Sequence, residues 1–138
     1  AEMIIRDGEG ATKFIKIEIK NAKNIDEVKI AGKAIGNSPL VKTAFFASDP
    51  NLGRILSALG NISSFDIDTD LIDIKLNNNF VVQNGKISPS YSETKALKAM
   101  KAKEFMLSVN LKRGKITSTV LTTDLSYEYI KINAEYRT

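Results

Sequence analysis

The sequence predicts a layered α/β or α+β fold in a single domain spanning residues 1–138. Three observations support this prediction. Apolar residues alternate with polar ones in some segments, recur at helical spacing in others, and the two kinds of segment interleave along the chain. Hydrophobic residues make up 43% of the chain, enough to bury a core. No linker, repeat or low-complexity tract divides it, so we expect one domain.

The first elements are a helix end, a strand and a helix. Ala1–Asp7 carries apolar residues but has no capping signal in front of it, so we expect the end of a truncated helix there. From Lys13 onward, apolar and charged residues alternate, which predicts a half-buried strand. Asn24, with Glu27 three places later, is an Asn-headed variant of the capping box and predicts a helix that Gly36-Asn37 ends.

Two more elements complete the first half. Leu40–Phe46 is a short apolar run, consistent with a buried strand. Asp49-Pro50 is expected to be an N-cap followed by proline at the first helical position. The helix that it opens has apolar residues on one side and ends at Gly60-Asn61.

The second half is expected to contain four strands and two helices. In order, they are strands at Leu71–Leu76 and Phe80–Gln83, a helix at Glu93–Lys103, strands at Glu104–Leu111 and Lys115–Thr122, and a short terminal helix at Ser126–Tyr136. Asparagine turns follow the first two strands. Arg113-Gly114 lies in the connection between the last two.

The composition excludes several kinds of chemistry. The chain has no Cys and no His, which removes disulfides, thiolates, the usual general base and the commonest metal ligand, so no metal site is expected. Its net charge of +4 comes from scattered lysines, which favours solvated helix faces over a nucleic-acid interface. No apolar run reaches the length of a membrane span and no signal peptide is recognisable, so a soluble cytoplasmic protein is expected.

Four unusual strings occur in order along the chain: DGEGATK at 7–13, AIGNSPLVKTA at 34–44, DPNLGRI at 49–55 and TDLSYEYIKINAEYRT at 123–138. Together they resemble the C-terminal part of the β-chain of the bifunctional glutamate/ornithine N-acetyltransferase family of arginine biosynthesis. The resemblance covers essentially the whole chain. It implies a layered αββα-type sandwich, the C-terminal domain of the ornithine acetyltransferase fold.

The resemblance also implies a mechanism. Members of this family are made as a precursor that cleaves itself before a threonine, and the α- and β-chains remain associated as a hetero-oligomer. The new N-terminal threonine accepts the acetyl group of N-acetylornithine, and glutamate then receives it. Bifunctional members also use acetyl-CoA as a donor. No bound cofactor is expected, with acetyl-CoA as a possible co-substrate.

This chain departs from the family pattern at two places. The family's nucleophilic threonine lies in a Thr-Met-Leu string upstream of the Gly-Glu-Gly segment; no such string occurs here, and Thr12 does not match it. No catalytic residue is therefore expected in this chain. Its expected partners are the α-chain and the upstream part of the β-chain. Leu52 stands where the family usually has Trp, which removes an indole N–H donor.

The resemblance implies three substrate-binding residues: Glu9, Asn133 and Thr138. The Glu9 carboxylate suits the α-amino group of an amino-acid substrate, and the Asn133 amide can serve either of that substrate's charged groups. Without the resemblance, Glu9 would be interpreted as a surface ion-pair partner of Lys13 or Arg6, and Thr138 as a frayed end.

Other motifs are given structural interpretations. The helix start at Asp49–Arg54 could bind an anion, but a well-formed helix start is preferred, with Arg54 exposed or holding a carboxylate. Gly8-Glu9-Gly10 lacks the third glycine and preceding strand of a dinucleotide fingerprint. Thr122-Thr123-Asp124 is interpreted as a strand end and turn. Two alternative functions remain: a non-catalytic binding or scaffold module and, more weakly, a basic nucleic-acid-binding domain.

Overall fold

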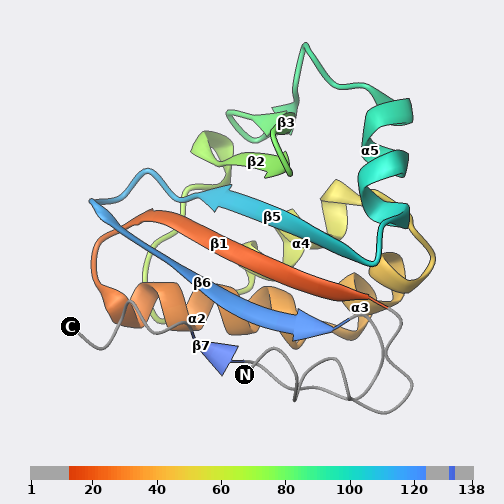
Figure 1. Cartoon of the computed structure of the whole chain (residues 1–138). Coiled ribbons are helices and arrows are strands. Elements are labelled where there is room, and N and C mark those ends of the chain that lie inside the picture. Colours follow the sequence, from red (N-terminus) through yellow and green to blue (C-terminus); the bar gives the residue numbers. More distant parts are fainter. Residues whose placement is uncertain (1–12, 124–130, 133–138) are drawn as a thin grey trace.

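The computed structural model describes residues 13–123 and 131–132. Within these residues, seven strands form one mixed sheet in the order β4-β3-β2-β5-β1-β6-β7 (Figure 1). The strands are β1 (Phe14–Ala22), β2 (Asp73–Leu76), β3 (Asn79–Gln83), β4 (Lys86–Ile87), β5 (Glu104–Asn110), β6 (Ile116–Thr123) and β7 (Lys131–Ile132). The helices are α2 (Ile25–Gly36), α3 (Pro39–Phe46), α4 (Leu52–Gly60), α5 (Glu93–Lys101) and the short 3-10 helix η1 (Thr69–Leu71).

The first described strand lies inside the sheet, between the two long strands of the second half of the chain. β1 pairs in parallel with β5 and antiparallel with β6. β5 and β6 follow each other in sequence but are not neighbours, so their connection passes the end of β1. The backbone N–H groups of Arg113 and Gly114 both donate to the Asn21 carbonyl at 2.8 Å, and this contact holds the connection against that strand end.

The core lies between the sheet and a single layer of helices. Ile15, Ile17 and Ile19 of β1 are fully buried, and alternation along the strand directs all three to the same face. They share one apolar cluster with residues of β5 and of helices α2, α3, α4 and α5. The predicted layered fold is confirmed: the described residues provide one sheet with one helical layer (Figure 1).

The predicted strand at Leu40–Phe46 is wrong, because this segment is helix α3. The Ser38 side chain accepts a hydrogen bond from the Val41 N–H at 3.3 Å, and Pro39 follows it at the first helical position. Val41, Ala44 and Phe45 are buried, at the i, i+3 and i+4 spacing of a helix face. A short apolar run does not distinguish a strand from a buried helix, and here the cap decides.

The predicted start of the next helix is also corrected. The N-cap of α4 is Asn51 rather than Asp49, and the helix begins at Leu52. The Asn51 side-chain oxygen accepts from the Arg54 N–H at 3.2 Å. Pro50 therefore precedes the cap instead of occupying the first turn.

Other elements also differ from the prediction. β2 begins at Asp73 instead of Leu71, because residues 69–71 form η1, which the Asp68 side chain caps. α5 ends at Lys101 rather than Lys103. Residues 131–132 were expected in a helix but form β7, whose backbone pairs with β6. The rest of Ser126–Tyr136, and Ala1–Asp7, lie outside the described residues. In the part of the chain that the structure describes, no helix is long and apolar enough to cross a membrane.

Candidate functional site

The residues predicted to bind substrate lie outside the described residues: Glu9, Asn133 and Thr138. The strands that adjoin two of them in sequence both pair with β6. On one side, Thr123 of β6 pairs with Phe14 of β1, which lies five residues after Glu9. On the other side, Val120 of β6 pairs with Ile132 of β7, which directly precedes Asn133. The C-terminal half of β6 thus lies between the strands that adjoin these two positions.

A buried polar corner lies at this end of the sheet. Lys13 directly precedes β1, and its side chain is buried. The Lys13 ammonium group donates to the Phe45 carbonyl at the end of α3 and to the Ser48 hydroxyl. Ser48 in turn lies 3.4 Å from the Met100 carbonyl of α5. Lys13 therefore connects the start of β1 to the helical layer.

A second buried lysine reaches the end of β6 from α3. Lys42 is 3% exposed, and its Nζ lies 3.5 Å from Oγ1 of Thr122. Thr122 and its neighbour Thr123 are both buried, and Thr122 Oγ1 also lies 3.5 Å from the Gly36 carbonyl. Lys13, Lys42 and Thr123 each take part in at least one further interaction.

This polar corner, formed by Lys13, Lys42, Ser48, Thr122 and Thr123, brings two ammonium groups into a region largely closed to water. Electrostatic interactions are stronger there than at the surface, so each buried ammonium group needs polar partners such as the contacts described above. Among the residues that the structure describes, no group of three or more acidic side chains could hold a metal ion.

Lys42 is not among the site residues predicted from the sequence. One signal could have found it: Lys42 is a charged residue inside the apolar run 40–46, where burial is expected to require compensating polar contacts. The interpretation of Thr122-Thr123 as a strand end is confirmed, because β6 ends at Thr123. What the sequence did not reveal is that this strand end faces α3.

The start of α4 has the structural role preferred in the sequence analysis. The Arg54 guanidinium donates to the Leu40 carbonyl at 2.9 Å, which joins α4 to the first turn of α3. Its partner is thus a backbone carbonyl rather than the carboxylate considered as one possibility.

An ion pair joins α2 to the β5–β6 connection. The hydrogen bond from the Arg113 side chain, with a backbone hydrogen bond from Lys23, lowers the pKa of Glu27 against the opposing effect of burial. The same pair raises the pKa of Arg113. Both charges are thereby stabilised in the folded chain. The predicted capping box is present in modified form. The Asn24 side chain accepts a hydrogen bond from the Glu27 N–H, as expected, but the Glu27 carboxylate accepts from the Lys23 N–H instead of the Asn24 N–H.

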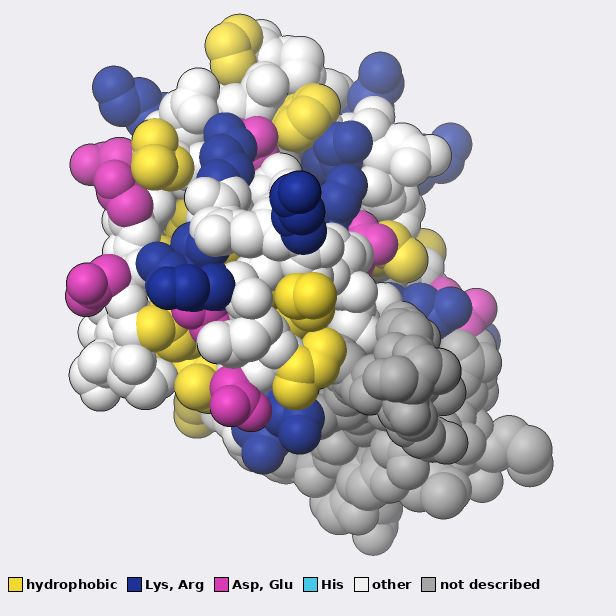
Figure 2. Space-filling view, turned by 90° about the vertical axis from the view of Figure 1, so that its left-hand side faces the viewer, with side chains coloured by type: hydrophobic (Ala, Val, Ile, Leu, Met, Phe, Trp, Pro, Cys, Tyr) yellow, Lys and Arg dark blue, Asp and Glu magenta, His cyan; other side chains and the backbone are white. Residues whose placement is uncertain are grey.

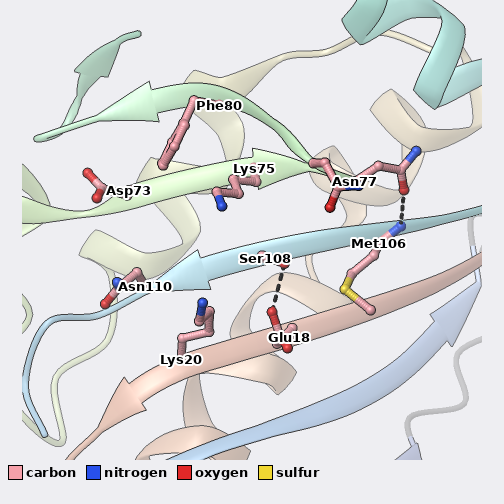
Figure 3. A pocket seen from close by; sticks show the side chains of 10 residues that line it. Glu18, Lys20, Asp73, Lys75, Asn77, Phe80, Met106, Ser108 and Asn110 are labelled. Atoms are coloured by element: carbon pink, nitrogen blue, oxygen red, sulfur yellow. Dashed lines mark hydrogen bonds between the residues drawn. The ribbon is translucent and has the colours of Figure 1, made fainter. Parts of the chain in front are cut away.

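A second polar region lies on the face of the sheet opposite the helices (Figure 3). A trough of about 390 Å³ runs along β5, with Met106, Ser108 and Asn110 on its floor. Charged side chains of β1 and β2 form its two walls. The Ser108 hydroxyl donates to the Glu18 carboxylate at 2.9 Å across the boundary between the floor and one wall.

Charges on the end of the molecule where β1 ends are mixed rather than grouped by sign. Figure 2 views this end and shows Lys and Arg side chains interspersed with acidic and apolar ones. Such a surface is typical of a solvated protein face.

Comparison with known proteins gives one consistent result. A family model described as the ArgJ family matches residues 1–138. The arginine biosynthesis bifunctional protein ArgJ of Neisseria meningitidis serogroup B is 49% identical over 137 residues, which cover 99% of this chain and 34% of the relative. The protein of the same description from Methylococcus capsulatus is 49% identical over 138 residues, covering 100% of this chain and 34% of the relative. The chain thus spans about a third of the length of these curated relatives.

A solved structure shows the same fold. The crystal structure of arginine biosynthesis bifunctional protein argJ from Bacillus halodurans aligns with a TM-score of 0.83 at 37% sequence identity. The alignment covers 94% of this chain and 60% of that one. The mixed sheet and its helical layer are therefore shared with that protein.

Proposed function

The chain belongs to the ArgJ family, and we propose that it is the C-terminal part of an enzyme that transfers the acetyl group of N-acetylornithine to glutamate. The observation that carries this proposal is the family match along the whole chain, together with relatives described as bifunctional proteins of arginine biosynthesis. Acetyl-CoA is an additional donor in the bifunctional form of this activity. The reaction is cytoplasmic in this proposal.

The nucleophile in the proposed enzyme is a threonine that becomes N-terminal when the precursor cleaves itself. Its own α-amino group acts as the base, as in other enzymes that use an N-terminal threonine. The threonine oxygen attacks the acetyl carbonyl, and oxyanion donors of the α-chain stabilise the tetrahedral intermediate. Ornithine leaves, and the amino group of glutamate then takes the acetyl group from the threonine. None of these reacting groups belongs to the present chain.

This chain contributes substrate positioning. Glu9 receives the α-ammonium group of the amino-acid substrate, and Asn133 and Thr138 hold its remaining polar groups. One structural feature supports this assignment: β6 pairs with both strands that adjoin Glu9 and Asn133 in sequence. Holding the substrate in one orientation lowers the entropic cost of the acetyl transfer.

Reconstitution tests the proposal. Acetyl transfer from N-acetylornithine to glutamate is measured with the 138-residue chain alone, and then with the chain mixed with the α-chain and the upstream part of the β-chain. We expect turnover only in the mixture. Turnover by the chain alone would overturn the assignment of the nucleophile to the missing part. An assembled but inactive mixture would favour the alternative, a non-catalytic binding module of the same family.

A further inference from the structure

The trough on the open face of the sheet has a regular arrangement of charges. Strand register places Glu18 of β1, Ser108 of β5 and Lys75 of β2 in one row across the sheet. Because neighbouring strands lie about 4.8 Å apart, the backbones of the two walls are roughly 10 Å apart. In this row the side chains are long on both walls and short on the floor, and this difference in length creates the hollow (Figure 3).

The next row has the opposite polarity. It consists of Lys20 on β1, Asn110 on β5 and Asp73 on β2. Asp73 is already engaged, since it forms an ion pair with Lys112 at 3.1 Å and accepts the Asn84 N–H at 2.9 Å. It is therefore a poor candidate for binding a further cation.

The other three charged side chains of the trough, Glu18, Lys75 and Lys20, form no ion pair with any residue that the structure describes. Glu18 accepts a hydrogen bond from the Ser108 hydroxyl, which occupies one of its oxygens. The Lys75 ammonium lies 4.5 Å from the centre of the Phe80 ring, a cation–π contact rather than an ion pair. The Lys20 ammonium forms no hydrogen bond or ion pair with any residue that the structure describes. The trough thus offers two ammonium groups and one carboxylate.

We propose that this trough binds an acidic α-amino acid, of which glutamate is the simplest probe. Such a ligand carries two carboxylates and one ammonium group, the complement of Lys20, Lys75 and Glu18. Residues two apart on a strand are separated by roughly 7 Å on the same face, a spacing that accommodates an amino-acid head group between Glu18 and Lys20. The ligand's side chain then crosses β5 and brings its second carboxylate to Lys75.

The charges that the trough takes from β1 lie away from the polar corner. Glu18 and Lys20 lie in the second half of β1, whereas Lys13 precedes the strand's first residue. Every group that the trough contributes belongs to the present chain, so binding requires no upstream partner. A failure of binding in the trough and a failure of acetyl transfer are consequently distinguishable.

Calorimetric titration of the 138-residue chain with L-glutamate tests the proposal. We expect saturable binding that is weakened about tenfold for glutamine and for glutarate, because each lacks one of the three charged contacts. Lys75→Met and Glu18→Gln should each weaken glutamate binding by a similar factor. Lys95→Met, which changes an exposed lysine of α5, serves as the matched control and should bind like the unmodified chain.

Glu18→Gln keeps an oxygen that accepts from Ser108, so it removes the charge while preserving the local hydrogen bond. Thermal melting of each variant confirms that it is folded, and Lys20→Met replaces any variant that is not. Absence of saturable glutamate binding would overturn the proposal. Equal affinity for glutamine and glutamate, or unaltered binding by the folded trough variants, would do so as well.

Discussion

Arg113 and Glu27, 86 residues apart in the chain, form a two-point ion pair between the β5–β6 connection and the first turn of α2. The Arg113 Nε donates to one carboxylate oxygen at 3.0 Å and Nη2 donates to the other at 2.8 Å. The guanidinium also lies 5.1 Å from the centre of the Phe65 ring. Because the connection passes the end of β1, this pair fastens the helical layer to the centre of the sheet.

Removing the arginine should destabilise the fold measurably. In Arg113→Met the Glu27 carboxylate, whose side chain is 6% exposed, loses its cationic partner. We expect a loss of about 2 kcal/mol in the free energy of unfolding, less than for a fully buried pair, because the Arg113 side chain remains 24% exposed. Urea denaturation measures this. Lys115→Met, an exposed neighbour in the same connection, should change it by less than about 0.5 kcal/mol.

The same pair predicts a dependence of stability on pH. The pKa of Glu27 in the fold lies below its ordinary value of 4.5, chiefly because of the hydrogen bond from Arg113. The stabilisation is therefore complete above about pH 4.5 and is lost as the pH falls through the lowered pKa. The difference in unfolding free energy between the unmodified chain and Arg113→Met should shrink on acidification. A difference that stays constant from pH 7 to pH 3 would contradict this, and Glu27→Gln should remove the pH-dependent part.

Two helical glycines should respond to alanine in opposite directions. A Cβ added at Gly32 of α2 would lie 2.5 Å from a Val120 methyl group, whereas at Gly53 of α4 it would meet only Asn51 Oδ1, at 3.5 Å. Gly53→Ala should stabilise the chain by about 0.5–1 kcal/mol through helix propensity. Gly32→Ala should destabilise it by about 1–2 kcal/mol, since the overlap outweighs that gain. Thermal melts of the two variants compare them directly.

Substrate positioning by Glu9 predicts a kinetic effect without a stability effect. In the reconstituted mixture, Glu9→Gln should reduce kcat/KM for acetyl transfer by about 100-fold, because the substrate's ammonium group loses its anchor. Glu93→Gln, at an exposed position on α5, provides the control and should leave the rate unchanged. Wild-type kinetics in Glu9→Gln, with the mixture shown to be assembled, would remove Glu9 from the proposed site.

The elements that could be predicted were those whose signals are local. Alternation identified β1, and the Asn24 cap identified α2, because both depend on neighbouring residues. The helix at Pro39–Phe46 also has a local signal: Ser38-Pro39 is a serine cap followed by proline at the first helical position, the same signal that Asp49-Pro50 offers eleven residues later. The β7 pairing had no such signal, because two residues at a sheet edge depend on a partner strand.

Short segments of the chain are enough to identify the family, through four ordered strings, and to predict a layered fold, through two hydrophobic periods. Which distant residues meet depends instead on the tertiary structure. The placement of β1 between β5 and β6 brings Glu18 beside Ser108, 90 residues later. It also directs Lys42 of α3 toward Thr122. Such contacts follow from strand order and register. These depend on burial and backbone pairing over the whole sheet, so no short segment of the sequence predicts them.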